Sequence, residues 1–359
     1  MFENLPAPRS ILLIRLSATG DVILASALTP VLRRAYPDAR LVWLTDDINT
    51  GLLIHHPAID RVIVFQRTYF RQLLRERRYL VLARAIKQLI SALREESFDW
   101  ALDLQGLLKS GLWARLSGAR VRFGLGSREG SQFWMHHVIS RDTEIDRIGV
   151  EYWLLAQALK LDPGAFPMDV KVPEIIQSGM DATLANRGCR FPYAVICPFT
   201  TRPQKHWPIQ RWRELSVKLI EQRNFHVILL GGPGDTGRAK DIAPQIEGFV
   251  DLTGTTTLIE AAAVIRKANL LIGVDTGLTH LGIALTTPTL ALFGSTRPYR
   301  NTGSSHAKVL YQPMDCSPCR KRPSCGGNFM CMKAHSVDDV VAQIALLTDG
   351  DETELTNIP

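Results

Sequence analysis

Short runs of apolar residues recur along the chain, and stretches of helical length separate them. Apolar runs bounded by turn residues are typical of buried strands, and their alternation with helices is typical of parallel sheets with crossover helices. In the first half, strands are predicted at residues 11–16, 41–45, 61–65, 100–104 and 121–124. In the second half, they are predicted at residues 194–199, 226–231, 270–274, 289–293 and 309–312. The pattern therefore predicts an α/β protein with two Rossmann-like halves.

A proline-rich stretch separates the two halves. Residues 161–193 contain four prolines, and breakers of this kind are typical of the segments that join domains. A chain of 359 residues also exceeds what one hydrophobic core usually organises. The sequence therefore predicts two domains, residues 1–172 and residues 173–359.

The composition is that of an ordinary globular protein. With 46% apolar and 21% charged residues, the chain can build large cores, which excludes extensive disorder. No window approaches the run of about eighteen apolar residues that a membrane span needs. The first ten residues lack the charged start and apolar run of a signal peptide. The expected location is therefore cytoplasmic.

The positive charge is unevenly distributed. Residues 1–150 hold 21 Lys and Arg against 15 Asp and Glu, whereas residues 151–359 hold 21 against 20. The net charge of +7 is compatible with nucleic acid, a membrane surface or a phosphorylated substrate as partner. No recognised nucleic-acid module accompanies this modest surplus, so no nucleic-acid partner is expected.

A basic segment at residues 67–94 contributes much of the surplus. Its Arg and Lys residues are interleaved with Leu and Ile near helical spacing, which predicts amphipathic helices with a cationic face. Two interpretations remain open. The segment is either a solvated helix face or a surface that meets anionic lipid or a phosphorylated acceptor.

A polar loop follows the first predicted strand. It contains Ser17, Thr19, Gly20 and Asp21, and a helix is predicted directly after it, at residues 22–35. Gly20 permits a tight turn, and Asp21 lies at the helix start, where the helix dipole favours a carboxylate. Either Asp21 is a plain helix cap, or it carries chemistry. The loop lacks the G-x-G-x-x-G dinucleotide fingerprint, which disfavours a dehydrogenase.

Three junctions in the second half have the composition of an anion site. Thr200, Thr201 and Lys205 follow the predicted strand at 194–199, and hydroxyl and ammonium groups there can bind phosphate oxygens. A glycine-rich turn at 231–235 ends in Asp235. A further strand passes directly into a helix start whose free N–H groups favour an anion; its residues are Asp275, Thr276, Gly277 and His280.

At these motifs the sequence resembles the ADP-heptose:lipopolysaccharide heptosyltransferases, a glycosyltransferase family (family 9) with the GT-B fold. The resemblance spans nearly the whole chain. It rests on the Ser-Ala-Thr-Gly-Asp loop, Thr-Thr-Arg-x-x-Lys-His-Trp-Pro, Gly-Gly-Pro-Gly-Asp and Gly-Val-Asp-Thr-Gly-Leu-Thr-His, in the family's order. Four ordered motifs are specific, whereas each one alone is weak.

The resemblance implies an inverting, metal-independent transfer of heptose from ADP-heptose to the inner core of lipopolysaccharide. The acceptor would be Kdo-lipid A or its heptosylated form, and the enzyme would lie peripherally at the cytoplasmic face of the inner membrane. The GT-B fold implies two parallel sheets facing a central cleft. Residues 1–172 would bind the acceptor, and residues 173–359 would bind the ADP-sugar.

The resemblance also implies roles for single residues. Asp21 matches the family's general base, and Ser17, Thr19 and Gly20 of the same loop are assigned to acceptor binding. The residues that match donor contacts are Thr200, Thr201, Lys205, Asp235, Asp275, Thr276, Gly277 and His280. Asp235 aligns only loosely, with an acidic ribose contact.

Four cysteines crowd into residues 316–331, with the spacing C-x₂-C-x₅-C-x₅-C. Cys316, Cys319, Cys325 and Cys331 could hold a structural zinc or iron ion, or they could be reduced thiols that need no metal. Many heptosyltransferases resemble this stretch, and relatives that glycosylate autotransporter proteins have an iron-binding finger there. By resemblance, this cysteine stretch slightly favours a heptosyltransferase of the second type. No cofactor is expected for catalysis.

Other functions remain open at this level. The same fold could use another nucleotide sugar or transfer heptose to a protein. A basic nucleic-acid-binding protein is a remote alternative. The acceptor sugar and the oligomeric state are left open by the sequence.

Overall fold

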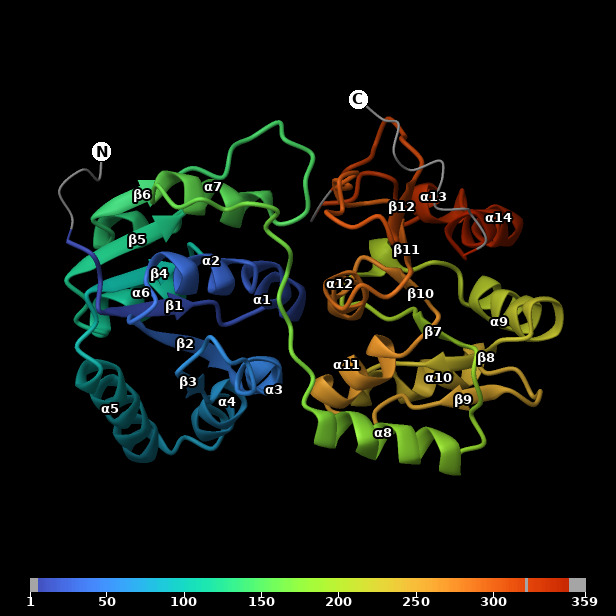
Figure 1. Ribbon diagram of the computed structural model, residues 1–359, viewed down its shortest axis with the longest axis horizontal. Coiled ribbons are helices and arrows are strands. Elements are labelled where there is room, and N and C mark those ends of the chain that lie inside the picture. The colour runs from blue at the N-terminus through green and yellow to red at the C-terminus, as the bar shows by residue number, and fades with distance from the viewer. Residues whose placement is uncertain (1–5, 320–321, 349–359) are drawn as a thin grey trace. The chain divides into compact units, whose positions relative to one another are not determined.

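The computed structural model describes residues 6–319 and 322–348, and the chain divides into two compact units (Figure 1). Unit 1 comprises Met1–Ile145 and Gly149–Lys171, and unit 2 comprises Asp146–Ile148 and Val172–Pro359. The short segment Asp146–Ile148 belongs to unit 2 because its backbone pairs with Asn301. Ile148 N donates to Asn301 O at 2.9 Å, and Asn301 N donates to Asp146 O at 3.1 Å.

Unit 1 is built on a six-stranded parallel sheet with the strand order β3-β2-β1-β4-β5-β6. This is the order of a Rossmann fold, in which the order of the strands across the sheet reverses between the first and fourth strands. The strands are β1 (Ser10–Ile14), β2 (Arg40–Asp46), β3 (Arg61–Phe65), β4 (Trp100–Asp103), β5 (Val121–Leu125) and β6 (His137–Ile139).

The helices of unit 1 connect these strands. They are α1 (Thr19–Ala25), α2 (Leu28–Ala35), η1 (Asp47–Asn49), α3 (Thr50–Leu53), α4 (Arg67–Arg75), α5 (Tyr79–Glu95), α6 (Leu108–Leu116), η2 (Ser131–Trp134) and α7 (Val150–Ala158). The prediction of a single helix at 22–35 is wrong, because the helix is interrupted at Ser26 and Ala27, between α1 and α2. Ser26 Oγ donates back to Ile23 O at 2.6 Å, a side-chain bond that competes with the helical ladder.

Unit 2 repeats the topology. Its parallel sheet has the order β12-β11-β10-β7-β8-β9, again that of a Rossmann fold. The strands are β7 (Tyr193–Cys197), β8 (His226–Leu229), β9 (Phe249–Asp251), β10 (Leu270–Val274), β11 (Thr289–Phe293) and β12 (Ala307–Tyr311). The helices are α8 (Glu174–Asn186), η3 (Pro203–Lys205), α9 (Ile209–Arg223), η4 (Pro233–Asp235), α10 (Thr236–Ile242), α11 (Leu258–Arg266), α12 (Gly277–Ala284), α13 (Met330–Lys333) and α14 (Val337–Thr348).

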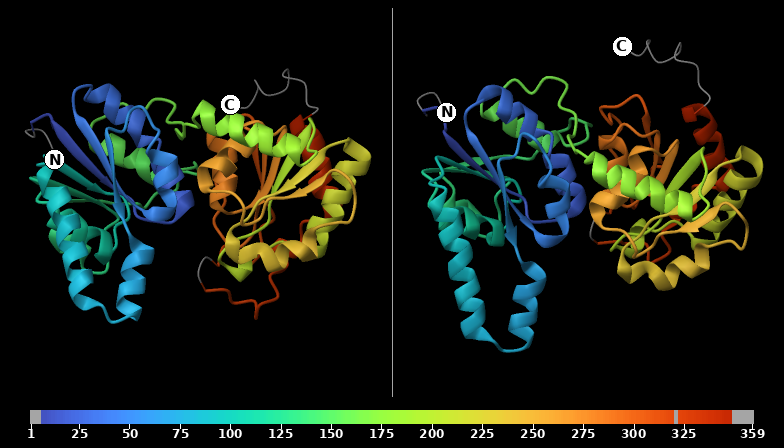
Figure 2. Two further views of the ribbon diagram at one scale, coloured as in Figure 1. Left: turned by 90° about the horizontal axis from the view of Figure 1, so that it is seen from below. Right: turned by 60° about the horizontal axis from the view of Figure 1, so that its bottom comes forward.

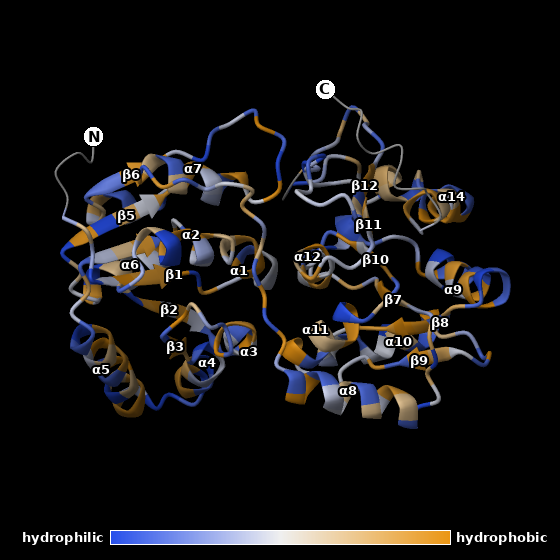
Figure 3. Ribbon diagram, in the orientation of Figure 1, coloured by the Kyte–Doolittle hydropathy of each residue, from blue (hydrophilic) through white to orange (hydrophobic). Residues whose placement is uncertain are grey.

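The central strands form the two cores. Every residue of β1, β7, β10 and β11 is buried, as expected for strands covered on both faces. In Figure 3 these strands are mostly hydrophobic, whereas many helices are hydrophilic on one side. The prediction of an α/β protein with two Rossmann-like parallel sheets is confirmed.

The Asp169 carboxylate joins the last segment of unit 1 to the buried His56, which follows α3. Asp169 Oδ2 lies 3.0 Å from Nε2 of the buried His56, and Asp169 Oδ1 lies 2.6 Å from Lys171 Nζ. The bond from His56 outweighs the effect of burial and, with Lys171, lowers the pKa of Asp169 to about 2. A carboxylate whose pKa is depressed in the folded state stabilises the fold above its ordinary pKa, and this contribution is lost as the pH falls toward 2.

The unfolding free energy should therefore depend on pH through Asp169. Between pH 5 and pH 3, we expect wild type to lose about 1 kcal/mol more stability than Asp169→Asn, which has no carboxylate to protonate. Urea denaturation at both pH values measures the difference. The exposed Asp38→Asn serves as the matched control and should follow wild type. Equal losses in wild type and Asp169→Asn would contradict the assignment.

Candidate active site

Asp21 caps the first helix of unit 1 and remains partly open to solvent. It lies in the first turn of α1, and its Oδ2 accepts a hydrogen bond from Ala18 N at 3.2 Å. The same Oδ2 forms an ion pair with Arg15, while 41% of the side chain is exposed. The helix-cap interpretation and the chemical interpretation are therefore compatible. One carboxylate oxygen is fixed, and the group as a whole stays within reach of a ligand.

Arg15 is the residue that orients this carboxylate. Its side chain, only 5% exposed, donates from Nη1 to Leu104 O at 2.7 Å and pairs through Nη2 with Asp21. Burial acts to lower the pKa of Arg15, but Tyr152 and the carboxylates of Asp21 and Glu151 outweigh it, so the pKa lies above the ordinary value. Tyr152 also donates its hydroxyl to Asp21 O at 3.2 Å. Asp21 is thus held by both its side chain and its backbone.

The rest of the loop continues this network. Thr19 Oγ1 donates to Asn49 Oδ1 at 2.8 Å, and Asn49 Nδ2 donates to Asp46 Oδ1 at 2.7 Å and to Leu16 O at 3.2 Å. Ser17 and Gly20 lie half-buried in the same loop. The network fixes the loop that carries Asp21 to the end of β2. All these groups lie at the carboxyl ends of the strands, where open α/β sheets bind ligands.

Arg15 should therefore act as a positioning residue for Asp21. Replacing it with Met should lower kcat by about ten- to a hundredfold, since misplacing a reacting group by about 1 Å can cost that much. Arg15→Lys should recover part of the loss because it restores the charge but not the forked geometry. Steady-state kinetics should show the donor KM unchanged in both variants. Equal losses for Met and Lys, or a raised donor KM, would contradict the role.

Unit 2 gathers a charged cluster around Asp275 at the end of β10. Lys205 Nζ forms an ion pair with Asp275 Oδ2, to which Thr296 Oγ1 also donates at 2.6 Å. His280 Nε2 lies 3.6 Å from Oδ1 of the same carboxylate. Burial acts to raise the pKa of Asp275, but His280 and Lys205 outweigh it and hold the pKa well below its ordinary value. Asp275 is therefore an ionised, buried anchor for Lys205.

His280 is oriented from its other side by Tyr299. The Tyr299 hydroxyl lies 3.0 Å from His280 Nδ1, and burial raises the pKa of Tyr299 well above its ordinary value. The phenol thus stays protonated at neutral pH. The imidazole of His280 is held between this hydroxyl at Nδ1 and the Asp275 carboxylate at Nε2.

The other predicted donor residues lie along the same edge of the sheet. Thr200 and Thr201 follow β7, Thr276 and Gly277 begin α12 after β10, and Asp235 follows β8. These three strands are neighbours in one parallel sheet, so their carboxyl ends share an edge. Asp235 Oδ2 accepts from Gly232 N at 3.0 Å, which is a turn cap. The structure thus brings these residues to one edge, with Lys205, Asp275 and His280 in direct association.

Several residues of this site were missed from the sequence. Arg15 lies at the end of a predicted strand and Thr296 lies in a segment that follows one, but the sequence assigned neither of them a role. Arg238 of α10 lies beside the edge, with its Nη1 3.1 Å from His206 Nε2 and its Nη2 3.0 Å from His206 Nδ1. Nothing in the sequence links Arg238 or Tyr299 to these partners.

The cysteine stretch shows no preformed set of metal ligands among the residues that the structure describes. Across residues 6–319 and 322–348, no group of three or more His, Cys, Asp or Glu side chains is arranged to hold an ion. Cys331 is buried in the core of unit 2, and burial raises the pKa of its thiol. Cys316, Cys319 and Cys325 are half-buried free thiols that are near enough to influence it. The zinc or iron ligand set suggested by the cysteine spacing therefore stays a prediction.

Comparison with known proteins assigns the family. The model of glycosyltransferase family 9 (heptosyltransferase) matches residues 86–329. The chain belongs to glycosyltransferase family 9. It is also 32% identical to lipopolysaccharide heptosyltransferase 1 of Pseudomonas aeruginosa, over 87% of this chain and 86% of that protein. The family assignment makes the protein a glycosyltransferase.

Two further family members agree. Lipopolysaccharide heptosyltransferase 1 of Salmonella typhimurium is 28% identical over 80% of this chain and 89% of its own length. The structure of Escherichia coli heptosyltransferase WaaC with ADP-2-deoxy-2-fluoro heptose superposes with a TM-score of 0.70 at 24% identity, covering 93% and 98% of the two chains. This family 9 chain therefore shares the heptosyltransferase fold. None of the helices that the structure describes is both long and apolar enough to cross a membrane.

Proposed function

We propose that this family 9 enzyme transfers heptose from ADP-heptose to the inner core of lipopolysaccharide, with Kdo-lipid A as the acceptor. The observation that carries the proposal is the similarity, over most of both chains, to the heptosyltransferase 1 of P. aeruginosa. The second relative bears the same name, which favours the first heptosyltransferase type. The lean toward the second heptosyltransferase type rested on the cysteine stretch alone, which is weaker support.

Unit 2 would bind the donor. The diphosphate carries negative charge, and Lys205 with the Thr200 and Thr201 hydroxyls supplies donors of the kind that bind phosphate oxygens. Thr276 is the N-cap of α12 and Gly277 is its first residue, and backbone N–H groups at such a helix start favour an anion. Lys205 is paired with Asp275 in the structure. Binding of the ADP-sugar would draw its ammonium group from this carboxylate toward the phosphates. The donor in the WaaC structure, an ADP-heptose analogue, supports the choice of nucleotide sugar.

Asp21 of unit 1 would act as the general base. An acceptor hydroxyl would lose its proton to the Asp21 carboxylate while its oxygen forms a bond to the anomeric carbon of heptose. The bond from that carbon to the β-phosphate oxygen would break, and ADP would leave with the electron pair. A single displacement of this kind inverts the anomeric centre. It needs a base on the acceptor side and stabilised charge on the leaving group, and no metal step.

A donor panel tests this proposal. Release of nucleoside diphosphate should be fastest with ADP-heptose and Kdo-lipid A, and it should persist in the presence of EDTA. ADP-glucose and UDP-sugars serve as donor controls, and an unmodified protein acceptor serves as the acceptor control. Faster turnover with another nucleotide sugar, or with the protein acceptor, would overturn the assignment.

Because Kdo-lipid A is lipid-linked, the proposal places the enzyme at the cytoplasmic face of the inner membrane.

A further inference from the structure

Helices α4 and α5 form a hairpin that projects from unit 1 (Figure 2). Its base is anchored in the core, where Phe70 and Leu73 of α4 and Leu89 and Leu93 of α5 are buried. Arg77 N donates to Leu74 O at 3.2 Å and Arg78 N donates to Leu73 O at 2.9 Å, so the turn between the helices is hydrogen-bonded. The hairpin is therefore an ordered extension of the core.

The outer end of the hairpin is fully exposed. Seven consecutive residues, 74–80, are exposed, and three of them carry large apolar side chains. Leu80 is 89% exposed, Tyr79 60% and Leu74 52%. Residues 74–80 are called the hairpin tip below. A folded core gains nothing from apolar side chains in this position, because their surface stays in water.

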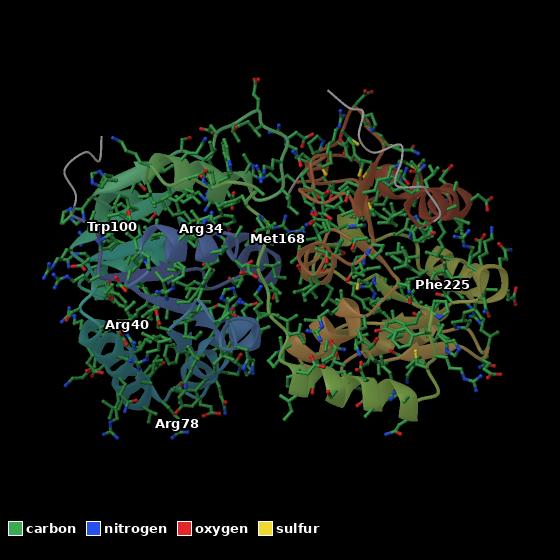
Figure 4. All side chains as sticks on the ribbon, viewed as in Figure 1. Arg34, Arg40, Arg78, Trp100, Met168 and Phe225 are labelled. Carbon is green, nitrogen blue, oxygen red and sulfur yellow. The ribbon has the colours of Figure 1, made fainter. Side chains whose placement is uncertain are left out.

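The charges around the hairpin tip are almost all positive. Residues 71–87 contain six basic residues and one acidic residue, Glu76, whose Oε2 lies 3.6 Å from Arg78 Nη1. Arg75, Arg84 and Lys87 form no ion pair with any other residue that the structure describes. Figure 4 labels Arg78 at the outer end of the hairpin. Apolar and unpaired cationic side chains therefore share one projecting end.

We propose that the hairpin tip docks the enzyme on an anionic lipid bilayer, with Tyr79 and Leu80 inserted among the headgroups. An interfacial helix takes apolar side chains into the acyl boundary while Lys and Arg meet anionic lipid. An anionic bilayer accounts for both the exposed apolar side chains and the basic side chains at this end of the hairpin. A solvated helix face would account for the charges but not for Leu80, and a soluble phosphorylated ligand would use the arginines but leave the apolar side chains in water.

The inference deepens the proposed function, whose lipid-linked acceptor lies in a membrane. It does not require turnover, since bilayer binding can be measured without donor or acceptor. The hairpin tip contains none of the residues assigned to the site. Membrane binding and catalysis should therefore separate in variants.

Sedimentation with vesicles tests the inference. The full chain should bind phosphatidylcholine vesicles that contain phosphatidylglycerol, and it should bind pure phosphatidylcholine vesicles far more weakly. The triple variant Arg75→Gln, Arg84→Gln, Lys87→Gln should weaken binding about a hundredfold, because each basic side chain near an anionic surface contributes about fivefold. Tyr79→Ser with Leu80→Ser should also weaken it about tenfold, through lost apolar burial.

Matched controls use equally exposed residues elsewhere. The triple variant Arg120→Gln, Arg213→Gln, Lys308→Gln and the single variant Ile175→Ser should bind vesicles like wild type. All variants should turn over a soluble, deacylated acceptor at the wild-type rate, which separates failure of docking from failure of the proposed function. Three results would overturn the inference: wild type that ignores anionic vesicles, hairpin variants that bind normally, or binding that excess inorganic pyrophosphate abolishes at constant ionic strength.

Discussion

Asp21→Asn should lower kcat by about two to four decades, the range that loss of a general base typically costs. Asparagine keeps the shape of the side chain and can still accept the bond from Ala18 N, but it cannot take the proton of an acceptor hydroxyl. The donor site lies in unit 2, so the dissociation constant for ADP should stay near the wild-type value. Coupled ADP-release kinetics and calorimetric ADP titration measure the two quantities.

The control for this variant must separate chemistry from folding. Asp21→Asn leaves the buried guanidinium of Arg15 without its partner, which costs stability. The melting temperature of the variant should therefore be recorded, and kinetics should be measured well below it. Asp38→Asn removes an exposed carboxylate of the same unit and should behave as wild type. Near-normal kcat in folded Asp21→Asn would remove Asp21 from the mechanism.

Lys205→Ala should weaken donor binding by about ten- to a hundredfold, which corresponds to the roughly 1.5–3 kcal/mol of a hydrogen bond to a charged group. The loss should appear in the dissociation constants of both ADP and ADP-heptose, because the ammonium group is expected to bind the diphosphate. Calorimetric titration measures it directly. Lys240→Ala removes an exposed lysine of the same unit and is the matched control.

The ion pair with Asp275 sharpens the interpretation of this variant. Without Lys205, the buried Asp275 carboxylate keeps Thr296 and His280 as partners, so unit 2 should remain folded. Lys205→Arg keeps the charge and should recover part of the binding. An unchanged donor dissociation constant in folded Lys205→Ala would exclude the phosphate role.

The strands were largely predictable from the sequence, and the exceptions have a common cause. The eight inner strands show as apolar runs because the centre of a parallel sheet is buried on both faces, and the edge strands β3 and β12 were also found because each has five residues. Strands β6 and β9 were missed because each has only three residues and lies at the edge of its sheet. His137 and Asp251 interrupt any apolar pattern there. Their existence depends on neighbouring strands far along the chain, which local sequence does not encode.

The candidate site was likewise only partly predictable from the sequence. Asp21, Lys205 and Asp275 were found because polar residues directly after buried strands lie where such sheets bind ligands. The partners of these residues come from distant segments: Tyr152 contacts the loop of Asp21 from α7, and Tyr299 orients His280 from beyond β11. Such pairs depend on three-dimensional packing. The cysteine prediction relied on spacing alone, which does not show that Cys331 is buried in the core.

The central claim is tested most directly by the product of a reaction with purified Kdo-lipid A and ADP-heptose. The account predicts that mass spectrometry will show the acceptor gaining one heptose residue, with one ADP released for each heptose transferred. An already heptosylated acceptor should gain none. The account would be contradicted if Kdo-lipid A stayed unmodified while the same preparation transferred sugar to the heptosylated acceptor. It would also be contradicted if Kdo-lipid A stayed unmodified while the preparation transferred sugar from another nucleotide sugar.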